Sequence, residues 1–503
     1  MTLPSLAPAL VIDTVVVTTG QLPAIVFEGP GVAPSGFQLR ASRQVLPAQL
    51  ISLGSRWSAR VPLLVSSWNG PLLPARSGRY AVIASAEDGT RMPVVLPAEL
   101  PASQLLPAIT RISFAAPDES LAITLSSPLS DRERGRLQQA SLESDYRATE
   151  YEPLNAVFFE SFYGQNASCN PLAIDRALAQ LRPDVERYWS VSDASVSVPD
   201  GAVALLEGSA EWWRIRGSAR LLVVNDWLRK RYRSRRHQTV LQTWHGTMLK
   251  KLALSRVRLG LRPTIATLRE RARWDILLAQ NPYGRGVFRR AYAFTGRVWE
   301  EGYPRDDVLL TGDPDRIRAR LGIRPGITVI LYAPTWRDDR PDHVDHLDVA
   351  HFADMLGDDY VTLIRGHSRT LLPGEDVHAP NVLDVTGYPD VSELFLVADA
   401  LVTDYSSVMF DFTVTGKPVF FFTPDLAHYA RKLRGFYFDL IPVAPGPVVS
   451  TAEELVTLVR DRDAVLRRYA EKYSAWRERF NPRDDGHAAD RVVRRLLDEG
   501  IIG

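Results

Sequence analysis

The chain has 503 residues, and its 60 basic and 59 acidic side chains leave a formal net charge of +1 at pH 7. This balance excludes a generally polybasic nucleic-acid-binding protein, and the length predicts two or three domains. A single cysteine, Cys169, excludes an internal disulfide and any metal site built from several cysteines.

The start of the chain lacks the pattern of a signal peptide. Residues 1–20 have no basic start, and Asp13 interrupts their apolar run. No apolar run in the sequence approaches the roughly 18 residues that a membrane-spanning helix needs. We therefore expect a cytoplasmic protein whose contact with a membrane is peripheral, on the inner face of the cell membrane.

Residues 1–145 are predicted to form a small β-rich accessory domain. Short strand-like runs are separated here by proline and glycine, and helical patterns are few. The runs cover Leu10–Val16, Ala24–Glu28, Arg60–Val65 and Tyr80–Ala84. Because no cluster of convergent polar residues is present, we expect a module that docks a partner and carries no chemistry of its own.

From about residue 150, apolar strands alternate with helices, which is typical of parallel sheets covered on both faces. The first set of predicted strands is 155–159, 186–191, 221–224, 239–242 and 274–279, with a helix over 171–181. The second set is 328–333, 360–364, 381–384, 401–403 and 418–422, with helices over 391–398 and 452–460. These sets predict an α/β fold of two doubly wound domains with a cleft between them. A basic amphipathic helix over 488–497 is expected to pack back on a neighbouring domain.

Polar residues follow three of these strands directly. Open α/β proteins place their chemistry at the carboxyl ends of buried strands, so each cluster is a candidate for function. The clusters are His245 and Gly246 after 239–242, Arg365, His367 and Ser368 after 360–364, and Asp404, Ser406 and Ser407 after 401–403, which ends in Thr403.

His245 has two interpretations. It could act as a general base, because histidine titrates near neutral pH and an attacking hydroxyl must lose its proton. It could equally be a packed loop histidine that is hydrogen-bonded to the backbone. The residues alone leave both interpretations open.

The other two clusters suit phosphate. The guanidinium of Arg365 can hold two phosphate oxygens, and a protonated His367 adds charge or a proton, although an interdomain salt bridge would also explain them. Ser406 and Ser407 can cap a helix and also dock a diphosphate. Asp404 would repel phosphate unless it orients a serine or a ribose hydroxyl.

Three further groups are less specific. Arg337, which follows Thr335, is either a phosphate contact or part of a structural ion pair. Lys250 and Lys251 begin a basic run that continues to residue 273 and is either a solvated helix face or a contact with anionic lipid or a polyphosphate acceptor. No motif for nucleic acid accompanies it. No cofactor or divalent metal is indicated, although Asp338, Asp339, His343 and His346 lie in one charged loop.

Several short motifs occur in a fixed order between residues 155 and 440. They are Phe158–Ser161, Ser168–Pro171, Leu241–Thr247, Gly302–Asp307, Tyr332–Arg337, Arg365–Ser368, Asp390–Leu394, Thr403–Ser407, Gly416–Pro418 and Arg434–Phe436. With these motifs the chain resembles the CDP-glycerol glycerophosphotransferases, the teichoic acid primase and polymerase family. Met248 departs from the pattern, because the family usually has proline there. The resemblance does not cover the N-terminal domain.

The resemblance implies a two-domain fold of the GT-B type and transfer of a polyol phosphate from a CDP-activated donor to a polymer on a lipid carrier. We therefore expect residues 146–304 to form the acceptor side and residues 305–503 the donor side. The predicted catalytic residues are His245 and His367. The donor contacts would be Arg365, Ser368, Thr403, Asp404, Ser406, Ser407, Thr335 and Arg337, and the acceptor or membrane side would hold Gly246, Lys250 and Lys251.

The expected donor is CDP-glycerol and the expected product is CMP. Within the same enzyme class, CDP-ribitol or another CDP-polyol remains an alternative, because the sequence shows phosphate contacts and no polyol contacts. The alternative outside the enzymes is a non-catalytic scaffold protein that binds nucleotide or polymer. Histidines at both strand ends argue against the scaffold.

Overall fold

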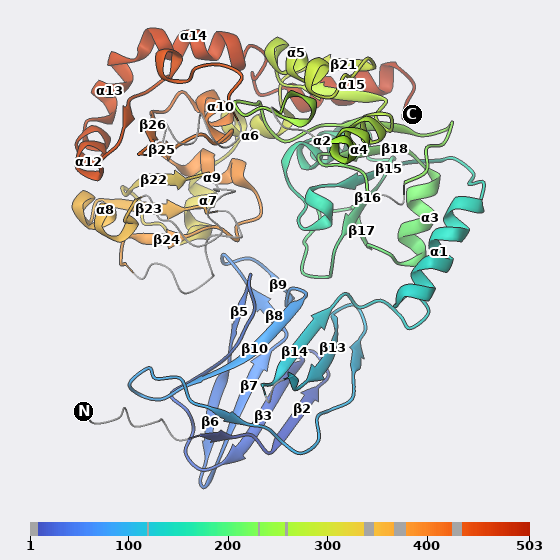
Figure 1. Cartoon of the computed structure of the whole chain (residues 1–503), viewed down its shortest axis with the longest axis vertical. Helices are drawn as coiled ribbons and strands as arrows, with labels where there is room; N and C mark the ends of the chain where they lie inside the picture. The colour runs from blue at the N-terminus through green and yellow to red at the C-terminus, as the bar shows by residue number, and fades with distance from the viewer. Residues whose placement is uncertain are drawn as a thin grey trace. The chain divides into compact units, whose positions relative to one another are not determined.

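A computed structural model describes residues 9–117, 120–229, 232–256, 260–335, 347–366, 379–424 and 435–503 (Figure 1). The chain divides into two compact units. Unit 1 comprises residues 1–142, 191–197 and 206–210, and unit 2 comprises residues 143–190, 198–205 and 211–503. The division falls within helix α1 (Arg136–Ala148).

Unit 1 is built mainly from two antiparallel sheets. The first has the order β2 (Thr14–Thr18), β3 (Ala24–Pro30), β7 (Arg56–Pro62) and β6 (Gln49–Leu53). The second has the order β12 (Gln104–Leu106), β13 (Thr110–Ala115), β14 (Ala122–Ser126), β10 (Gly78–Ser85), β4 (Gly36–Arg40) and β5 (Val45–Pro47). Two small sheets pair β1 (Leu10–Val11) with β11 (Val94–Val95) and β8 (Leu64–Ser66) with β9 (Leu72–Pro74).

The alternation of side chains along these strands builds the core of unit 1. In β7, Trp57, Ala59 and Val61 are buried while the residues between them stay partly exposed, as the two-residue period of a strand requires. The ring of Phe37 lies 5.0 Å from that of Phe27 and 5.9 Å from that of Trp57. Burying each such side chain stabilises the fold by roughly 1.5–3 kcal/mol.

The first sheet of unit 2 has seven strands. Their order is β17 (Val203–Leu206), β16 (Glu186–Val191), β15 (Leu154–Glu160), β18 (Ala219–Val224), β19 (Thr239–Gln242), β20 (Ile276–Ala279) and β21 (Arg297–Glu300). The pairs from β16 to β21 are parallel. The five strands predicted for this region are confirmed, whereas β17 and β21 were not predicted.

The second sheet of unit 2 has six strands, and all of its pairs are parallel. Their order is β24 (Val382–Asp384), β23 (Tyr360–Ile364), β22 (Thr328–Ala333), β25 (Ala400–Thr403), β26 (Val419–Phe422) and β27 (Val448–Val449). Strands β25 and β26 are buried at every position, which explains why they are continuous apolar runs in the sequence.

In each sheet of unit 2, the order in which the chain adds strands reverses at one strand. In the first sheet, β15 lies between β16 and β18, and in the second, β22 lies between β23 and β25. The chain therefore leaves the first strand toward one edge and later returns to its other side. In open α/β sheets, ligands bind at the carboxyl ends of the strands at such a reversal point.

A helix from the end of the chain completes the first half of unit 2. Helix α15 (Ala488–Asp498) contacts α2 (Cys169–Leu181), as Figure 1 shows, so the prediction that it packs back is confirmed. Its buried face carries Val492, Val493 and Leu496, which follow the helical repeat. Asp307 accepts hydrogen bonds from the backbone N–H groups of residues 488 and 489, at 2.9 and 2.8 Å, and so caps the helix.

Candidate active site

The loop after β19 presents His245 in a constrained turn. Trp244 adopts a left-handed backbone conformation with φ of 56°. The buried side chain of Asn170, on α2, donates from Nδ2 to the carbonyl oxygens of Thr243 at 3.1 Å and Trp244 at 3.2 Å. The indole of Trp244 stacks on the imidazole at 5.0 Å between ring centroids. Asn170 therefore holds the backbone of the turn, and the indole of Trp244 holds the half-buried ring of His245.

The hydrogen bond of His245 fixes which ring nitrogen is available. Nδ1 lies 2.6 Å from the carbonyl oxygen of Asn225, and a carbonyl can only accept, so Nδ1 carries the hydrogen. In the neutral ring, Nε2 then keeps its lone pair. Burial lowers the pKa of His245 below its ordinary value, and the carboxylate of Asp226 opposes this effect. The ring is therefore poised to accept a proton at Nε2.

The turn also approaches residues that lie far along the chain. A Cβ atom added to Gly246 would lie 3.0 Å from Oγ and 3.3 Å from Cβ of Ser407, so glycine is needed for this close approach. Ser407 precedes the short helix α10 (Val408–Phe412) at the end of β25. The structure thus brings together His245 and the predicted phosphate residue Ser407, which come from the two separate sheets.

The segment that follows the turn pairs with residues 435–437. The N–H of Tyr437 donates to the carbonyl of Leu249 at 2.8 Å, and the N–H of Lys251 donates to that of Gly435 at 3.1 Å. Lys250 and Phe436 form the antiparallel bridge between these bonds. This short ladder joins the loop that carries His245 to a loop of the second sheet. It brings the residues that follow the motif Leu241–Thr247 next to Gly435 and Phe436, which are far from them in the sequence.

Lys250 contacts a residue that was predicted on the donor side. Its Nζ donates to Oγ1 of Thr335 at 3.3 Å. The sequence suggested an acceptor or membrane role for Lys250, whereas the structure places its ammonium group at the carboxyl end of β22. A cation in this position is suited to balance a phosphate.

Asp404 and Thr403 make structural contacts with the loop after β22. The N–H of Thr335 donates to both carboxylate oxygens of Asp404, at 2.9 and 3.0 Å. The hydroxyl of Thr403 donates to the carbonyl of Ala333 at 2.7 Å. Asp404 therefore orients backbone, while the half-buried hydroxyls of Ser406 and Ser407 lie next to it in the chain.

Arg365 is directed to the backbone of its own sheet. Its Nη1 donates to the carbonyl oxygens of Val385 at 3.3 Å and Tyr388 at 2.8 Å. These contacts join β23 to the loop after β24, and they are not the interdomain salt bridge considered from the sequence. Burial lowers the pKa of Arg365 to about 10, with Asp390 opposing the effect, so the guanidinium stays charged at neutral pH.

Some predicted site residues lie outside the described residues: His367, Ser368 and Arg337, together with Asp338, Asp339, His343 and His346. Their roles stay predictions. Within the described ranges, no group of three or more histidine, cysteine, aspartate or glutamate side chains is arranged to hold a metal ion.

A buried ion pair beside the site joins two residues that were not predicted as site residues. Arg305 donates from Nη2 to both carboxylate oxygens of Asp411 at 2.7 Å, and its exposed fraction is 7% against 1% for Asp411. The N–H of Arg305 donates to Oδ1 of Asn170 at 3.1 Å. Arg305 lies within the motif Gly302–Asp307, and that motif was the only signal in the sequence.

Two buried carboxyl groups lie next to this ion pair. Gln280 donates from Nε2 to Asp306 at 3.0 Å and to Asp484 at 2.8 Å. Burial raises the pKa of Asp484 to about 7 and that of Asp306 well above its ordinary value, and the charge of Asp411 raises both further. The folded chain therefore holds a proton at neutral pH that the unfolded chain would release.

We predict that Asp306→Asn reduces the loss of stability at high pH. Burial raises the pKa of the Asp306 carboxyl, so the stability contributed by its bound proton is complete below about pH 4 and is lost as the pH rises through that raised pKa. The amide mimics the protonated carboxyl, so as the pH rises the free energy of unfolding should fall by about 1–2 kcal/mol less than in the unsubstituted protein. Denaturant titrations at four pH values measure this. The exposed Asp315→Asn is the control, and an equal fall in all three proteins would contradict the prediction.

Comparisons with known proteins bear on the same region. Residues 147–498 match the family described as CDP-Glycerol:Poly(glycerophosphate) glycerophosphotransferase. The chain is 35% identical over 364 residues to the teichoic acid poly(glycerol phosphate) polymerase of Bacillus subtilis (strain 168), which covers 68% of this chain and 48% of that protein. It is 34% identical over 367 residues to the teichoic acid glycerol-phosphate transferase of Staphylococcus aureus, which covers 68% of this chain and 93% of that protein.

The chain thus spans about half the length of the first relative and most of the second. Among solved structures, the wall teichoic acid polymerase TagF is similar, with a TM-score of 0.67 and 35% identity over 73% of this chain and 94% of that chain. The fold is therefore α/β with parallel sheets, like that of TagF. The resemblance first seen in the order of the motifs is confirmed, and the chain belongs to the CDP-glycerol:poly(glycerophosphate) glycerophosphotransferase family.

Proposed function

We propose that this chain transfers glycerol phosphate from CDP-glycerol to a hydroxyl group of a teichoic-acid-like or capsular polymer carried on a lipid, and releases CMP. The observation that carries the proposal is the hydrogen bond from Nδ1 of His245 to Asn225, which leaves Nε2 able to act as a base in a turn whose Gly246 closely approaches Ser407. The relatives support the donor, since one solved TagF structure is a histidine-to-asparagine variant soaked with CDPG.

The proposed reaction begins when Nε2 of His245 takes the proton of the acceptor hydroxyl. The hydroxyl oxygen attacks the phosphorus that carries glycerol, and a new P–O bond forms. The bond from that phosphorus to the bridging oxygen breaks, and CMP leaves with the electron pair. Positioning and charge neutralisation supply much of the rate in phosphoryl transfer, so the surrounding cations matter as much as the base.

The finer arrangement belongs to the same proposal. Residues 146–304 and 305–503 form two Rossmann-like domains of a GT-B fold that face each other across a cleft, with the acceptor on the first and the donor on the second. The two reversal points support this, because the ends of β18 and β19 carry Asn225 and His245 while the end of β25 leads to Ser407. Helix α15 lies within residues 305–503 and packs on α2 of the first domain.

On the donor side, we assign the diphosphate to Ser406, Ser407, Arg365 and His367, with Ser368 and Arg337 as further contacts. Thr403, Asp404 and Thr335 act indirectly, because their described hydrogen bonds shape the loop after β22. Lys250 joins this group through its contact with Thr335. Gly246 admits the close approach of the two loops, and Lys251 stays with the acceptor side.

We predict that His245→Ala lowers turnover far more than donor affinity. A general base contributes roughly 100-fold to 10,000-fold in rate while it touches the donor little. Release of CMP and binding of CDP-glycerol by calorimetry measure the two quantities separately. Arg365→Ala is the comparison, because it should weaken donor binding as well. Near-normal turnover in a folded His245→Ala protein would show that the base lies elsewhere.

Glycerol is favoured over ribitol as the polyol. The match to the poly(ribitol-phosphate) polymerase of Bacillus spizizenii is 25% identical over 278 residues, whereas the matches to three poly(glycerol phosphate) polymerases are 32–37% identical over 360 to 365 residues. A panel of CDP-glycerol, CDP-ribitol and nucleotide sugars, scored for nucleotide release, tests the donor. A protein that binds CDP-glycerol and releases no CMP with any acceptor would be a scaffold.

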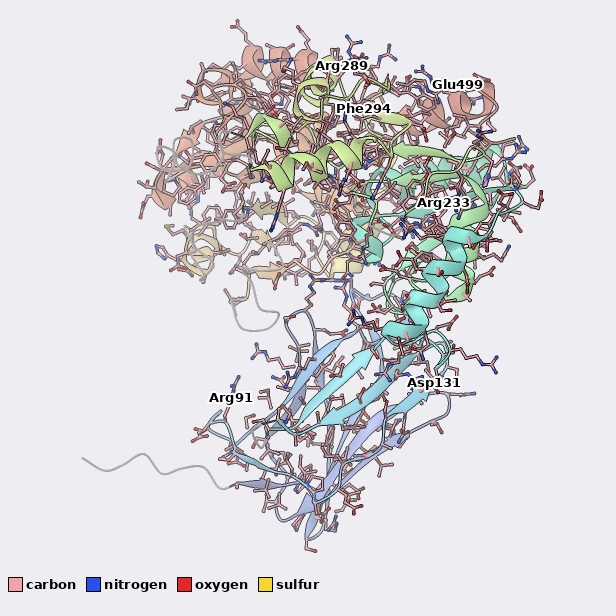
Figure 2. The ribbon with its side chains drawn as sticks, turned by 45° about the vertical axis from the view of Figure 1, so that its right-hand side comes forward. Arg91, Asp131, Arg233, Arg289, Phe294 and Glu499 are labelled. Atoms are coloured by element: carbon pink, nitrogen blue, oxygen red, sulfur yellow. The ribbon has the colours of Figure 1, made fainter. Side chains whose placement is uncertain are left out.

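The exposed face of helix α4 (Leu261–Arg271) supports peripheral contact with an anionic membrane, where a lipid-linked acceptor would lie. Leu261, Ile265 and Leu268 share one face of the helix and are 82%, 46% and 36% exposed. Exposed arginines accompany them: Arg262, Arg269, Arg285, Arg289 and Arg290, of which Arg289 is labelled in Figure 2 on α5 (Pro282–Ala291). Apolar side chains flanked by arginine are typical of helices that lie in the interface. Among the described residues, no helix is long and apolar enough to cross a bilayer.

We predict that replacing Leu261, Ile265 and Leu268 together with glutamine weakens binding to vesicles that contain anionic lipid by about 10-fold or more, because three apolar side chains no longer enter the interface. Co-sedimentation with vesicles measures the binding. Leu310→Gln, at another exposed leucine, is the matched control. Unchanged binding in the triple variant would contradict a membrane role for α4.

Unit 1 is proposed to be an accessory module, since every proposed site residue lies outside it. We predict that deleting residues 1–134, which retains α1 and its buried Tyr146, leaves the affinity for CDP-glycerol within about 2-fold while changing acceptor use or membrane location. Calorimetry and a transfer assay with a soluble acceptor analogue measure both. If a folded truncation lost donor binding, unit 1 would be part of the donor site.

A further inference from the structure

Three loops from neighbouring strands meet around the imidazole of His245. They follow β15, β18 and β19, which are adjacent in the first sheet. The ring of Phe162, after β15, lies 5.6 Å from the imidazole, and the carbonyl of Asn225, after β18, accepts its Nδ1 hydrogen at 2.6 Å. The N–H of Phe162 donates to Oδ1 of Asn225 at 2.9 Å, so these two supports are linked.

Asp226 is anchored at the same place by several hydrogen bonds. Its Oδ1 accepts from the N–H of Trp227 at 2.7 Å and from the hydroxyl of Tyr163 at 2.8 Å. Its carbonyl accepts from Nε2 of Gln242 at 2.8 Å, and Oε1 of Gln242 accepts from the N–H of Trp244 at 2.9 Å. The carboxylate is therefore fixed by Trp227 and Tyr163, and Gln242 links the backbone of Asp226 to the turn that carries His245.

The loop that supplies Tyr163 is strained. Phe162 and Tyr163 have φ values of 45° and 58°, a left-handed conformation that costs non-glycine residues roughly 1–2 kcal/mol each. Arg229 holds the loop in this conformation, with its guanidinium 4.9 Å from the ring of Tyr163 and Nη2 donating to the Tyr163 carbonyl at 3.2 Å. Strain of this kind persists where the surrounding structure fixes it, and it clusters at functional sites.

We propose that Asp226, held in place by Tyr163, is a positioning residue that stabilises the imidazolium formed when His245 takes the acceptor proton. The inference rests on the proposed role of His245 as the base. As the proton moves from the acceptor oxygen to Nε2, the ring gains one positive charge. The carbonyl of Asn225 accepts from Nδ1 in both states, and the fixed carboxylate of Asp226 interacts more strongly with the charged ring.

Among the charged groups that shift the pKa of His245, Asp226 is the one whose effect is not cancelled by a paired opposite charge. Burial lowers the pKa of the imidazole most, Arg305 lowers it as well, and Asp226 and Asp411 raise it. Asp411 is paired with Arg305 through both carboxylate oxygens, so the effects of these two largely cancel. Without Asp226 the buried ring would resist protonation, and a base with a very low proton affinity is a poor acceptor in the transition state.

The test is the pH dependence of kcat/KM in three variants. Asp226→Asn removes the charge and keeps the shape, so the acidic limb should move to lower pH by roughly 0.5–1 pH unit and the plateau should fall by about 2-fold to 10-fold. Asp226→Glu keeps the charge, so its midpoint should stay near that of the unsubstituted protein. Tyr163→Phe removes a donor that holds the carboxylate in place, so its midpoint should move to lower pH by less than that of Asp226→Asn.

Tyr283→Phe is the matched control, because its hydroxyl donates to the carbonyl of Met248 at 2.7 Å near the same turn without touching Asp226. Its midpoint should not move. If Asp226→Asn lowered the plateau and left the midpoint unchanged, Asp226 would be merely structural and the inference would be overturned. An unmoved midpoint in Tyr163→Phe would overturn the part assigned to Tyr163.

A measurement without turnover separates this inference from the proposed function. In protein labelled with ¹⁵N-histidine, the His245 ring signal, assigned by its loss in His245→Gln, should titrate at lower pH in Asp226→Asn. An unmoved titration overturns the inference even if His245 is the base. Full activity in His245→Ala would instead remove the proposed base, and the pairing of Asp226 with the ring would still be decided by the titration.

Discussion

The buried ion pair between Arg305 and Asp411 is the constraint on which the candidate site depends. Asp411 lies on α10, the helix that begins directly after Ser407. The backbone N–H of Arg305 binds the side chain of Asn170, which in turn binds the turn that carries His245. Removing one partner would leave an uncompensated buried charge, which costs roughly 3–5 kcal/mol. The positions of His245 and of the Ser407 hydroxyl are therefore set by the interior of unit 2.

Three ionisable side chains near that ion pair, Asp306, Asp484 and His245, have pKa values shifted by burial. Asp306 and Asp484 share the same interior and hold a proton, so negative charge does not accumulate beside Asp411. On the other side, burial disfavours a charged imidazole while Asp226 favours it. The pKa of His245 is therefore set by the balance between burial, which lowers it, and Asp226, which raises it. A change at Asp226, Arg305 or Asp411 should therefore alter the proton affinity of His245.

The sequence predicted most strands of unit 2 well, because their buried runs are continuous and apolar, whereas in unit 1 the expected strands Leu10–Val16 and Arg60–Val65 each run across a break between two strands. The bounds of β19, β22 and β23 agree with those expected, and His245 lies at a strand end as predicted. Partners were harder to predict. Arg305 and Asp411 are 106 positions apart, and no local pattern pairs them. Arg365 and Asp404 were interpreted by their chemistry alone, whereas much of their hydrogen bonding goes to nearby backbone. The two-residue strand β27 is too short to give a pattern.

The packing of α15 on α2 has a consequence for how the protein is made. Asp307 caps a helix whose first residues come 181 positions later, and the buried face of that helix completes the first half of unit 2. During synthesis the first sheet therefore emerges from the ribosome long before its covering helix. Until residue 498 has been released, α2 keeps an apolar surface open to solvent or chaperones. A nascent chain can form the strand that leads to His245 early, and it cannot close the structure around that strand until synthesis is nearly finished.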